Sequence, residues 1–371
     1  MMRKSSKKAA LAVAAMLVGS MFCTPVFAAA PDTNEATYGD VDLKSWGDNN
    51  DVASVGAQVF DSLDYNIATS FSVRAINGSA TNPENYNDVM AIGARVGESR
   101  DWNIATMKGD VTAKNFGSGI SGLRNEVTAI GAQILDSKNG NTATQGANVT
   151  ASNSGDFSNV TAIGVSIADS GHNNTATTGS WGAVTATNIP NGADLVNPTN
   201  GVHDAGLNNV LAFGAGISES GDGNTAHMQT YVSAINYANY GNTYGNDVTA
   251  IGALVSGSDN GNTAKAWSTF AEIWPDRNDQ IDGYHGESYN NTATSLGAQV
   301  IDSGSYNTAN AMNVRLDMGG FGNSVAAVGA QVLNSGNYNV ATGGDVYAKS
   351  VGNNNKITAI GAQISKSVKK K

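Results

Sequence analysis

The chain has 371 residues, a formal net charge of −10 at pH 7 and a single cysteine. This acidic balance argues against a nucleic-acid partner, and one cysteine cannot form an internal disulfide. Forty-four glycines beside only 14% charged residues would be unusual in a globular enzyme, so the composition favours a repetitive, non-enzymatic protein.

The first thirty residues have the three parts of a secretory signal peptide. A basic stretch from Arg3 to Lys8 precedes an apolar run from Ala9 to Phe22, and small residues follow up to Ala30. The apolar run is too short to span a bilayer. We therefore predict that residues 1–30 are a signal peptide that contains the only cysteine. The rest of the chain would be secreted to the exterior or surface of a bacterium, without membrane insertion.

Residues 31–371 are predicted to form a single repeat domain, because the phrase Ile-Gly-Ala or a close variant occurs in it nine times. Its glycines are Gly56, Gly93, Gly131, Gly164, Gly214, Gly252, Gly297, Gly329 and Gly361. An asparagine lies ten residues after each of the first eight glycines, and an equivalent asparagine opens the array. These asparagines are Asn34, Asn66, Asn103, Asn141, Asn174, Asn224, Asn262, Asn307 and Asn339.

Each repeat divides into two arcs. The A arc contains the glycine, runs between two asparagines and is 16 residues long in every copy. The B arc starts with Asn-x-Ala and varies from 16 to 34 residues, with insertions near 183–208 and 269–289. The repeats therefore form nine coils, each with a B arc followed by an A arc. Because only the B arcs vary in length, the inserted residues should emerge on one side of the stack.

The A arc has the composition of a strand that is covered on both faces. The residues one before, one after and three after the glycine are small or apolar, and we expect them to share a face. The opposite face carries Asn, Val, Ala, Gly and often a glutamine: Gln58, Gln133, Gln299, Gln331 or Gln363. Such strands are buried on both sides. The predicted core includes Ile92, Ile130, Ile163, Ile251, Val328 and Ile360.

A single coil of this kind cannot bury its apolar face, whereas parallel coils stacked in register bury it and pair their backbone groups. We therefore predict an all-β fold, a parallel β-solenoid of nine two-arc coils, each strand–turn–strand. The asparagines and glutamines named above would form ladders about 4.8 Å apart, with amides hydrogen-bonded along the stack. No capping segment is recognisable, so one molecule can continue the stack of another.

The turn between the arcs resembles the curlin repeat of curli-type functional amyloids. Gly336-Asn-Tyr-Asn339-Val-Ala341 and Gly304-Ser-Tyr-Asn307-Thr-Ala309 carry the motif Gly-x-x-Asn-x-Ala. The resemblance implies a secreted subunit that polymerises into biofilm-matrix fibres through a β-solenoid with Asn and Gln ladders. The phrase Asn323-Ser-Val-Ala-Ala-Val-Gly is also similar, more weakly, to the head repeat of trimeric autotransporter adhesins.

We expect a structural subunit that self-assembles head to tail into extracellular, curli-like fibres of a biofilm matrix. Its partners would be further copies of itself, including lateral pairing of two stacks, and a nucleator or secretion partner. The alternative is a discrete cell-surface adhesin that binds host or glycan surfaces. A contact loop for such binding would contain Trp267, Phe270, Trp274 and Tyr284.

No catalytic set and no cofactor motif stands out, so neither enzymatic activity nor a cofactor is expected. Acidic residues five positions after the glycine would stack into a column of carboxylates. These either extend into solvent or are bridged by a cation such as calcium. They are Asp61, Glu98, Asp136, Asp169, Glu219 and Asp302.

Overall fold

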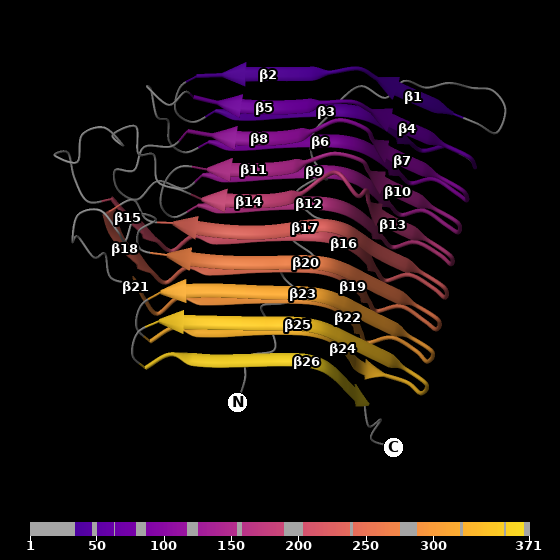
Figure 1. The fold of residues 1–371 in the computed structure, drawn as a ribbon. Helices are drawn as coiled ribbons and strands as arrows, with labels where there is room; N and C mark the ends of the chain where they lie inside the picture. Colours follow the sequence, from indigo (N-terminus) through magenta and orange to yellow (C-terminus); the bar gives the residue numbers. More distant parts are fainter. Residues whose placement is uncertain are drawn as a thin grey trace. The chain divides into compact units, whose positions relative to one another are not determined.

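A computed structural model describes residues 34–46, 50–62, 64–78, 87–116, 125–153, 158–188, 203–237, 240–274, 288–319, 322–351 and 354–366. The predicted signal peptide, residues 1–30, lies outside this range. All regular structure among the described residues is β-strand, and the strands belong to one compact unit, Pro31–Lys371. Figure 1 shows them as parallel layers that follow the order of the sequence. The all-β class and the parallel stacking predicted from the sequence are thus confirmed.

One sheet of nine parallel strands contains the glycine-centred strand of every repeat. Its strands are β3 (Asp51–Phe60), β6 (Asp88–Gly97), β9 (Glu126–Leu135), β12 (Asn159–Ala168), β16 (Asn209–Ser218), β19 (Asp247–Ser256), β22 (Thr292–Ile301), β24 (Ser324–Ser335) and β26 (Lys356–Lys366). They are neighbours in this order, and each pairs with the equivalent residues of the next repeat.

A second sheet of fourteen parallel strands faces the first. The early repeats supply pairs of short strands, which are β1 (Glu35–Tyr38) and β2 (Val41–Ser45), β4 (Ile67–Ser70) and β5 (Val73–Asn77), β7 (Ile104–Met107) and β8 (Val111–Asn115), β10 (Thr142–Gln145) and β11 (Val149–Asn153), β13 (Thr175–Thr178) and β14 (Val184–Asn188). The later repeats supply single long strands, which are β17 (Thr225–Tyr237), β20 (Thr263–Trp274), β23 (Thr308–Gly319) and β25 (Val340–Val351). The strand β17 pairs with both β13 and β14, which joins the two patterns.

A third, small sheet arises from the longer B arcs. It contains β15 (His203–Gly206), β18 (Tyr240–Tyr244) and β21 (Ser288–Tyr289), which also pair in parallel. The insertions predicted near 183–208 and 269–289 are therefore partly regular, since the first contains β14 and β15 and the second contains β21.

The interior between the two large sheets is filled mainly by alanine and valine. Ala143 and Val149 come from the fourteen-stranded sheet, and Val127 and Ala129 come from the nine-stranded sheet. All four are fully buried. Because equivalent residues occupy the same place in each repeat, apolar columns form at the spacing of a parallel sheet.

The glycine-centred strand changes its alternation at the glycine. In β9, Ala129 points to the interior before Gly131, and Ala132 does so immediately after it. The glycines themselves are skipped in the register, where the pair Ile130–Ile163 is followed directly by Ala132–Val165. The alternation of faces thus reverses at the glycine in both strands, and the register between them does not shift.

Close packing explains why this residue is glycine. A Cβ on Gly131 would lie 2.4 Å from the carbonyl oxygen of Gly164 in the next strand. It would also lie 2.9 Å from Val149 across the interior. Any side chain at this place would collide with backbone that cannot move without separating the strands, so the glycine column is a steric requirement of the stack.

The expectation that residues before and after the glycine share one face is therefore wrong. Ile130 lies outside the interior cluster, whereas Ala132 and Ile134 belong to it. A Cβ on Gly216, two positions after its glycine, would touch the ring of Phe213, one position before. The position of the expected glutamines therefore shares its face with the column of Ile130. Strict alternation fails at the glycine, where the order of the faces reverses in each strand without a shift in register.

The predicted core residues occupy that outer column. Four of the six are 1–6% exposed and two are half-buried, and none of the six belongs to the cluster between the sheets. The buried ones are Ile92, Ile130, Ile163 and Val328, and the half-buried ones are Ile251 and Ile360.

Candidate assembly surfaces

A continuous column of asparagines lies at the turn that leads into the fourteen-stranded sheet. The structure brings all nine predicted asparagines, from Asn34 to Asn339, into one chain of hydrogen bonds. In each case the side-chain Nδ2 donates to Oδ1 of the asparagine in the next repeat, at 2.8–3.2 Å. The direction of donation is the same throughout, from the N-terminal repeat towards the C-terminal one.

The inner members of this column are fully satisfied despite complete burial. Asn174 is 0% exposed. Its Oδ1 accepts from the backbone N–H of Asn141 at 3.1 Å and from Asn141 Nδ2 at 2.9 Å, and its own Nδ2 donates to Gly171 O at 2.6 Å as well as to Asn224. A buried amide without such partners would be costly, so the column ties each repeat to its neighbour.

A second column was not predicted. The asparagines that end the short B strands donate Nδ2 to Oδ1 of the next repeat at 3.0–3.2 Å. The donors are Asn77, Asn115, Asn153 and Asn188, and the last acceptor is Asn236, which lies within the long strand β17. Each of these asparagines is the last residue of the phrase Val-x-Ala-x-Asn. This phrase recurs in five consecutive repeats, so it could have revealed the column.

The five predicted glutamines do not form one ladder. Gln299 donates to Gln331 at 2.7 Å, and Gln331 donates to Gln363 at 2.9 Å. In the register of the early repeats, however, Arg95 stands between Gln58 and Gln133. The glutamine ladder is therefore confined to Gln299, Gln331 and Gln363, in the last three repeats.

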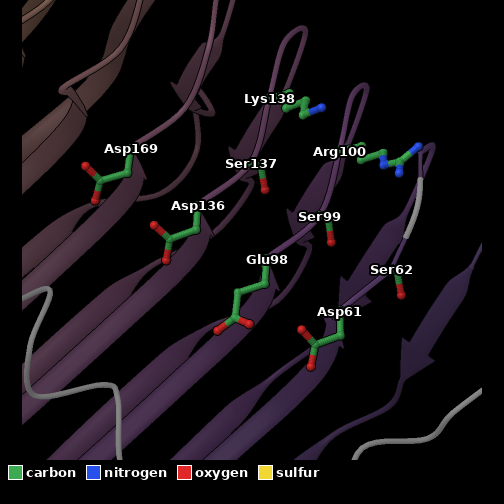
Figure 2. A pocket seen from close by; sticks show the side chains of 9 residues that line it. All are labelled: Asp61, Ser62, Glu98, Ser99, Arg100, Asp136, Ser137, Lys138 and Asp169. Carbon is green, nitrogen blue, oxygen red and sulfur yellow. The ribbon is translucent and has the colours of Figure 1, made fainter.

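The acidic residues after the strands of the nine-stranded sheet form a row on successive turns. Figure 2 shows Asp61, Glu98, Asp136 and Asp169 side by side, with a row of serines next to them. Each of these four acidic residues has a left-handed backbone, with φ between 48° and 51°. The serine that follows stabilises the turn, and Ser99 Oγ, for example, donates to Gly97 O at 2.9 Å.

Neighbouring carboxyls in this row raise the pKa values of Glu98 and Asp169. A hydrogen bond with the Asp61 side chain, and then the charge of Asp61, raise the pKa of Glu98. Burial, and then a hydrogen bond with Glu219, raise the pKa of Asp169. Within the described ranges, no group of three or more His, Asp or Glu side chains is arranged to hold a metal ion. The calcium site considered from the sequence gains no support there.

The predicted contact loop is only partly within the described residues. Trp267 lies on β20 and is 48% exposed, and Tyr231 on β17, whose register partner is Ser268, is 62% exposed. Phe270 is half-buried under the guanidinium of Arg315, 5.6 Å from the ring centre. Trp274 ends β20, and Tyr284 lies outside the described residues.

The two ends of the stack expose positions that are buried in the inner repeats. Ile364 in β26 is 49% exposed, whereas its neighbour in register, Val332, is 0% exposed. At the other end Leu43 in β2 is 41% exposed, and its neighbour Ala75 is 0% exposed. Among the strands described, β1, β2 and β3 at one end and β25 and β26 at the other pair on one side only. Within the described ranges no strand pairs with their other edges, and such edges are templates for a further strand.

No family model matches the chain, and comparisons with curated proteins and with solved structures find no match. The described part of the chain contains no helix with the length and apolar character needed to cross a membrane. The class of protein is therefore defined by the fold itself, a stack of parallel β-strands of the β-solenoid type.

Proposed function

We propose that this protein is a secreted structural subunit, without enzymatic activity, that self-assembles head to tail into extracellular fibres. The fibres would be of the curli-like, biofilm-matrix kind, formed outside a bacterium with the help of a nucleator or secretion partner. The observation that carries the proposal is the pair of ends, β1 to β3 at one and β25 and β26 at the other. Among the described residues, no further strand pairs with either end, and both expose columns that are buried in the inner repeats. Parallel sheets with exposed edges add further strands readily.

In this proposal the stack comprises nine two-arc coils, and a second copy supplies a tenth. If the register of the nine-stranded sheet continues, β26 of one copy meets β3 of the next. Ile364 then lies against Val59, and Ala362 lies against Ala57, as Val332 and Ala330 lie against their own neighbours. At these interior positions, apolar residues would meet apolar residues across the junction.

The direction of the side-chain hydrogen bonds favours head-to-tail contact. Each Nδ2 in the asparagine column donates towards the following repeat, so Asn339 presents a donor at one end and Asn34 presents an acceptor at the other. The glutamine ladder runs the same way and ends at Gln363, which would face Gln58 of the next copy. Donor and acceptor therefore match only when unlike ends meet.

Electron microscopy and thioflavin fluorescence on the purified protein test the proposal, together with sedimentation. We expect unbranched fibres above a critical concentration. A protein that stays monomeric at high concentration and forms no fibres over several days would contradict the proposal.

The substitution Gly361→Ala gives a sharper test of the junction. A Cβ on Gly361 meets no atom within 4 Å in a single copy, whereas one on Gly329 would lie 2.2 Å from the oxygen of Gly361. In a junction, the added methyl group would meet Gly56 of the next copy in the same way. The variant should therefore fold normally and fail to elongate. The control is Trp181→Ala, at a side chain that is 91% exposed on an inner repeat, and it should assemble normally.

The alternative function is a discrete cell-surface adhesin that binds host or glycan surfaces. The exposed rings of Tyr231 and Trp267, on neighbouring strands, favour it, because such rings stack on sugars and apolar surfaces. Binding of glycans by a stable monomer, lost in Trp267→Ala, would support this alternative.

A further inference from the structure

The first position of each strand in the nine-stranded sheet forms a column whose charge changes along the stack. It starts with three carboxylates and ends with a lysine. In register order the residues are Asp51, Asp88, Glu126, Asn159, Asn209, Asp247, Thr292, Ser324 and Lys356. Acidic side chains are therefore concentrated at the β3 end, and the β26 end carries the opposite charge.

Neither end of the column has its charge balanced by the column itself. Asp51 stands next to Asp88, and Asp88 stands next to Glu126, so like charges are directly opposite on neighbouring strands. Burial, and then the charge of Asp51, raise the pKa of Asp88, as expected where carboxylates crowd. Lys356 is exposed and has only Ser324 beside it in the column.

We propose that every head-to-tail junction places Lys356 of one copy against Asp51 of the next. The inference rests on the proposed function and specifies how two copies recognise each other. The shift of one repeat that brings Ile364 to Val59 also brings Lys356 to Asp51, so the apolar match and the charge match occur in the same register. A slip by one residue would break the ion pair and turn the apolar side chains to the wrong face.

This pairing gives the junction both a direction and a sensitivity to salt. The lysine approaches a column of three carboxylates, and its attraction to them is screened as ionic strength rises. Two N-terminal ends present carboxylates to each other, and two C-terminal ends present lysines. Only unlike ends gain from the contact.

Charge reversal tests the inference. Lys356→Glu sets a carboxylate against Asp51, and Asp51→Lys sets an ammonium group against Lys356. Each variant alone should show a critical concentration for assembly about tenfold above that of the wild type, the effect of replacing one exposed attraction by a repulsion. At 1 M salt, where the screening length is about 3 Å, the difference should nearly disappear.

A mixture of the two variants is the decisive measurement. If they alternate, one junction pairs the two substituted positions with their charges exchanged, and the next junction pairs the native Lys356 with the native Asp51. We therefore expect co-assembly near the wild-type critical concentration from two proteins that assemble poorly apart. Recovery in the mixture would also show that both variants are folded. The matched control Lys138→Glu changes the net charge equally on an inner turn and should assemble as the wild type does.

Two results would overturn the inference. If the single variants assemble as well as the wild type, or if the mixture assembles no better than its components, Lys356 does not meet Asp51. Either result leaves the fibre proposal standing when the wild type forms fibres. A wild-type protein that forms none would overturn both.

Discussion

The ring of Tyr306 stacks on the ring of Tyr338 in the next repeat, with centroids 5.0 Å apart and planes inclined by 9°. Both tyrosines have left-handed backbone conformations, with φ of 62° and 56°. The equivalent turn position holds Gly140, Gly223 and Gly261 in inner repeats, also at positive φ. A tyrosine there carries a backbone cost that glycine avoids, and the stacked rings offset part of it.

Substitutions at Tyr338 separate these two effects. Tyr338→Ala loses the ring contact and keeps the backbone cost, whereas Tyr338→Gly loses the contact and removes the cost. We expect the glycine variant to be more stable than the alanine variant by about 1 kcal/mol. Thermal unfolding of dilute protein measures the difference, and equal stabilities would show that the turn is not strained.

The glycine column should tolerate no side chain in inner repeats. A Cβ on Gly164 would lie 2.5 Å from the oxygen of Gly214 and 2.8 Å from Val184. Gly164→Ala should therefore lower the free energy of unfolding by about 3 kcal/mol. The control is Gly39→Ala, where a Cβ meets nothing within 4 Å and no comparable loss is expected. Similar denaturant midpoints for the two variants would contradict the steric account.

The buried asparagine column should be costly to interrupt. Asn174→Ala removes the oxygen that accepts from both the backbone N–H and the Nδ2 of Asn141 in a site that excludes water, and we expect a loss of about 3 kcal/mol. Asn159 makes a hydrogen bond of 3.0 Å to Asn209 on the exposed side of the stack. Asn159→Ala should cost no more than about 0.5 kcal/mol. Urea unfolding of both variants makes the comparison, and similar losses would mean that burial of the column is unimportant.

One interior residue destabilises the stack. Gln145 is 0% exposed, and neither its Oε1 nor its Nε2 has a hydrogen-bond partner. In the preceding repeat the same place holds the fully buried Met107. Gln145→Met should raise the free energy of unfolding by about 1–2 kcal/mol, because it removes an unsatisfied buried amide and preserves volume. The reverse change, Met107→Gln, should lower it. An unchanged or lower melting temperature of Gln145→Met would show that the amide is satisfied in solution.

The column of carboxylates should make stability depend on pH. Burial, and then neighbouring charge, raise the pKa of Asp88 and of Glu126 in the folded protein. Folded protein therefore binds protons more readily than unfolded protein. Stability should rise as pH falls from 7 through the raised folded pKa values towards the ordinary values of 3.8 and 4.5.

Two variants should change this pH dependence in opposite directions. Asp88→Asn should raise the melting temperature at pH 7 and reduce the gain on acidification towards the ordinary carboxyl pKa values. Asn159→Asp adds a carboxylate beside Glu126 and should do the opposite. Parallel pH profiles for the wild type and both variants would refute the prediction.

Much of the fold follows from the spacing of a few residues. The interval of ten residues between glycine and asparagine is constant, so the register of strands and the column from Asn34 to Asn339 could be predicted from the sequence. The reversal of faces at Gly131 could not, because it breaks the strict alternation on which face assignment depends. The prediction of a ladder through all five glutamines was wrong. A ladder needs a glutamine in the neighbouring repeat, and Arg95 occupies that place beside Gln58.

The arrangement of strands in the B arcs could not be predicted from the sequence for a different reason. Whether an arc forms two short strands or one long strand depends on the bend between them, and the pairing of β17 with both β13 and β14 shows that the two forms stack together. The third sheet arises from segments without a common motif, so its pairing is decided by proximity in the stack and not by a repeated phrase.

The uniform direction of the asparagine amides gives the molecule an electrical axis. Eight side-chain dipoles, from Asn34 to Asn307, point the same way along the stack. Aligned dipoles add, as they do for the peptide groups of a helix, and the positive pole lies towards β25 and β26. Molecules joined end to end would sum this polarity over their whole length and orient in an applied electric field, whereas antiparallel bundles would cancel it.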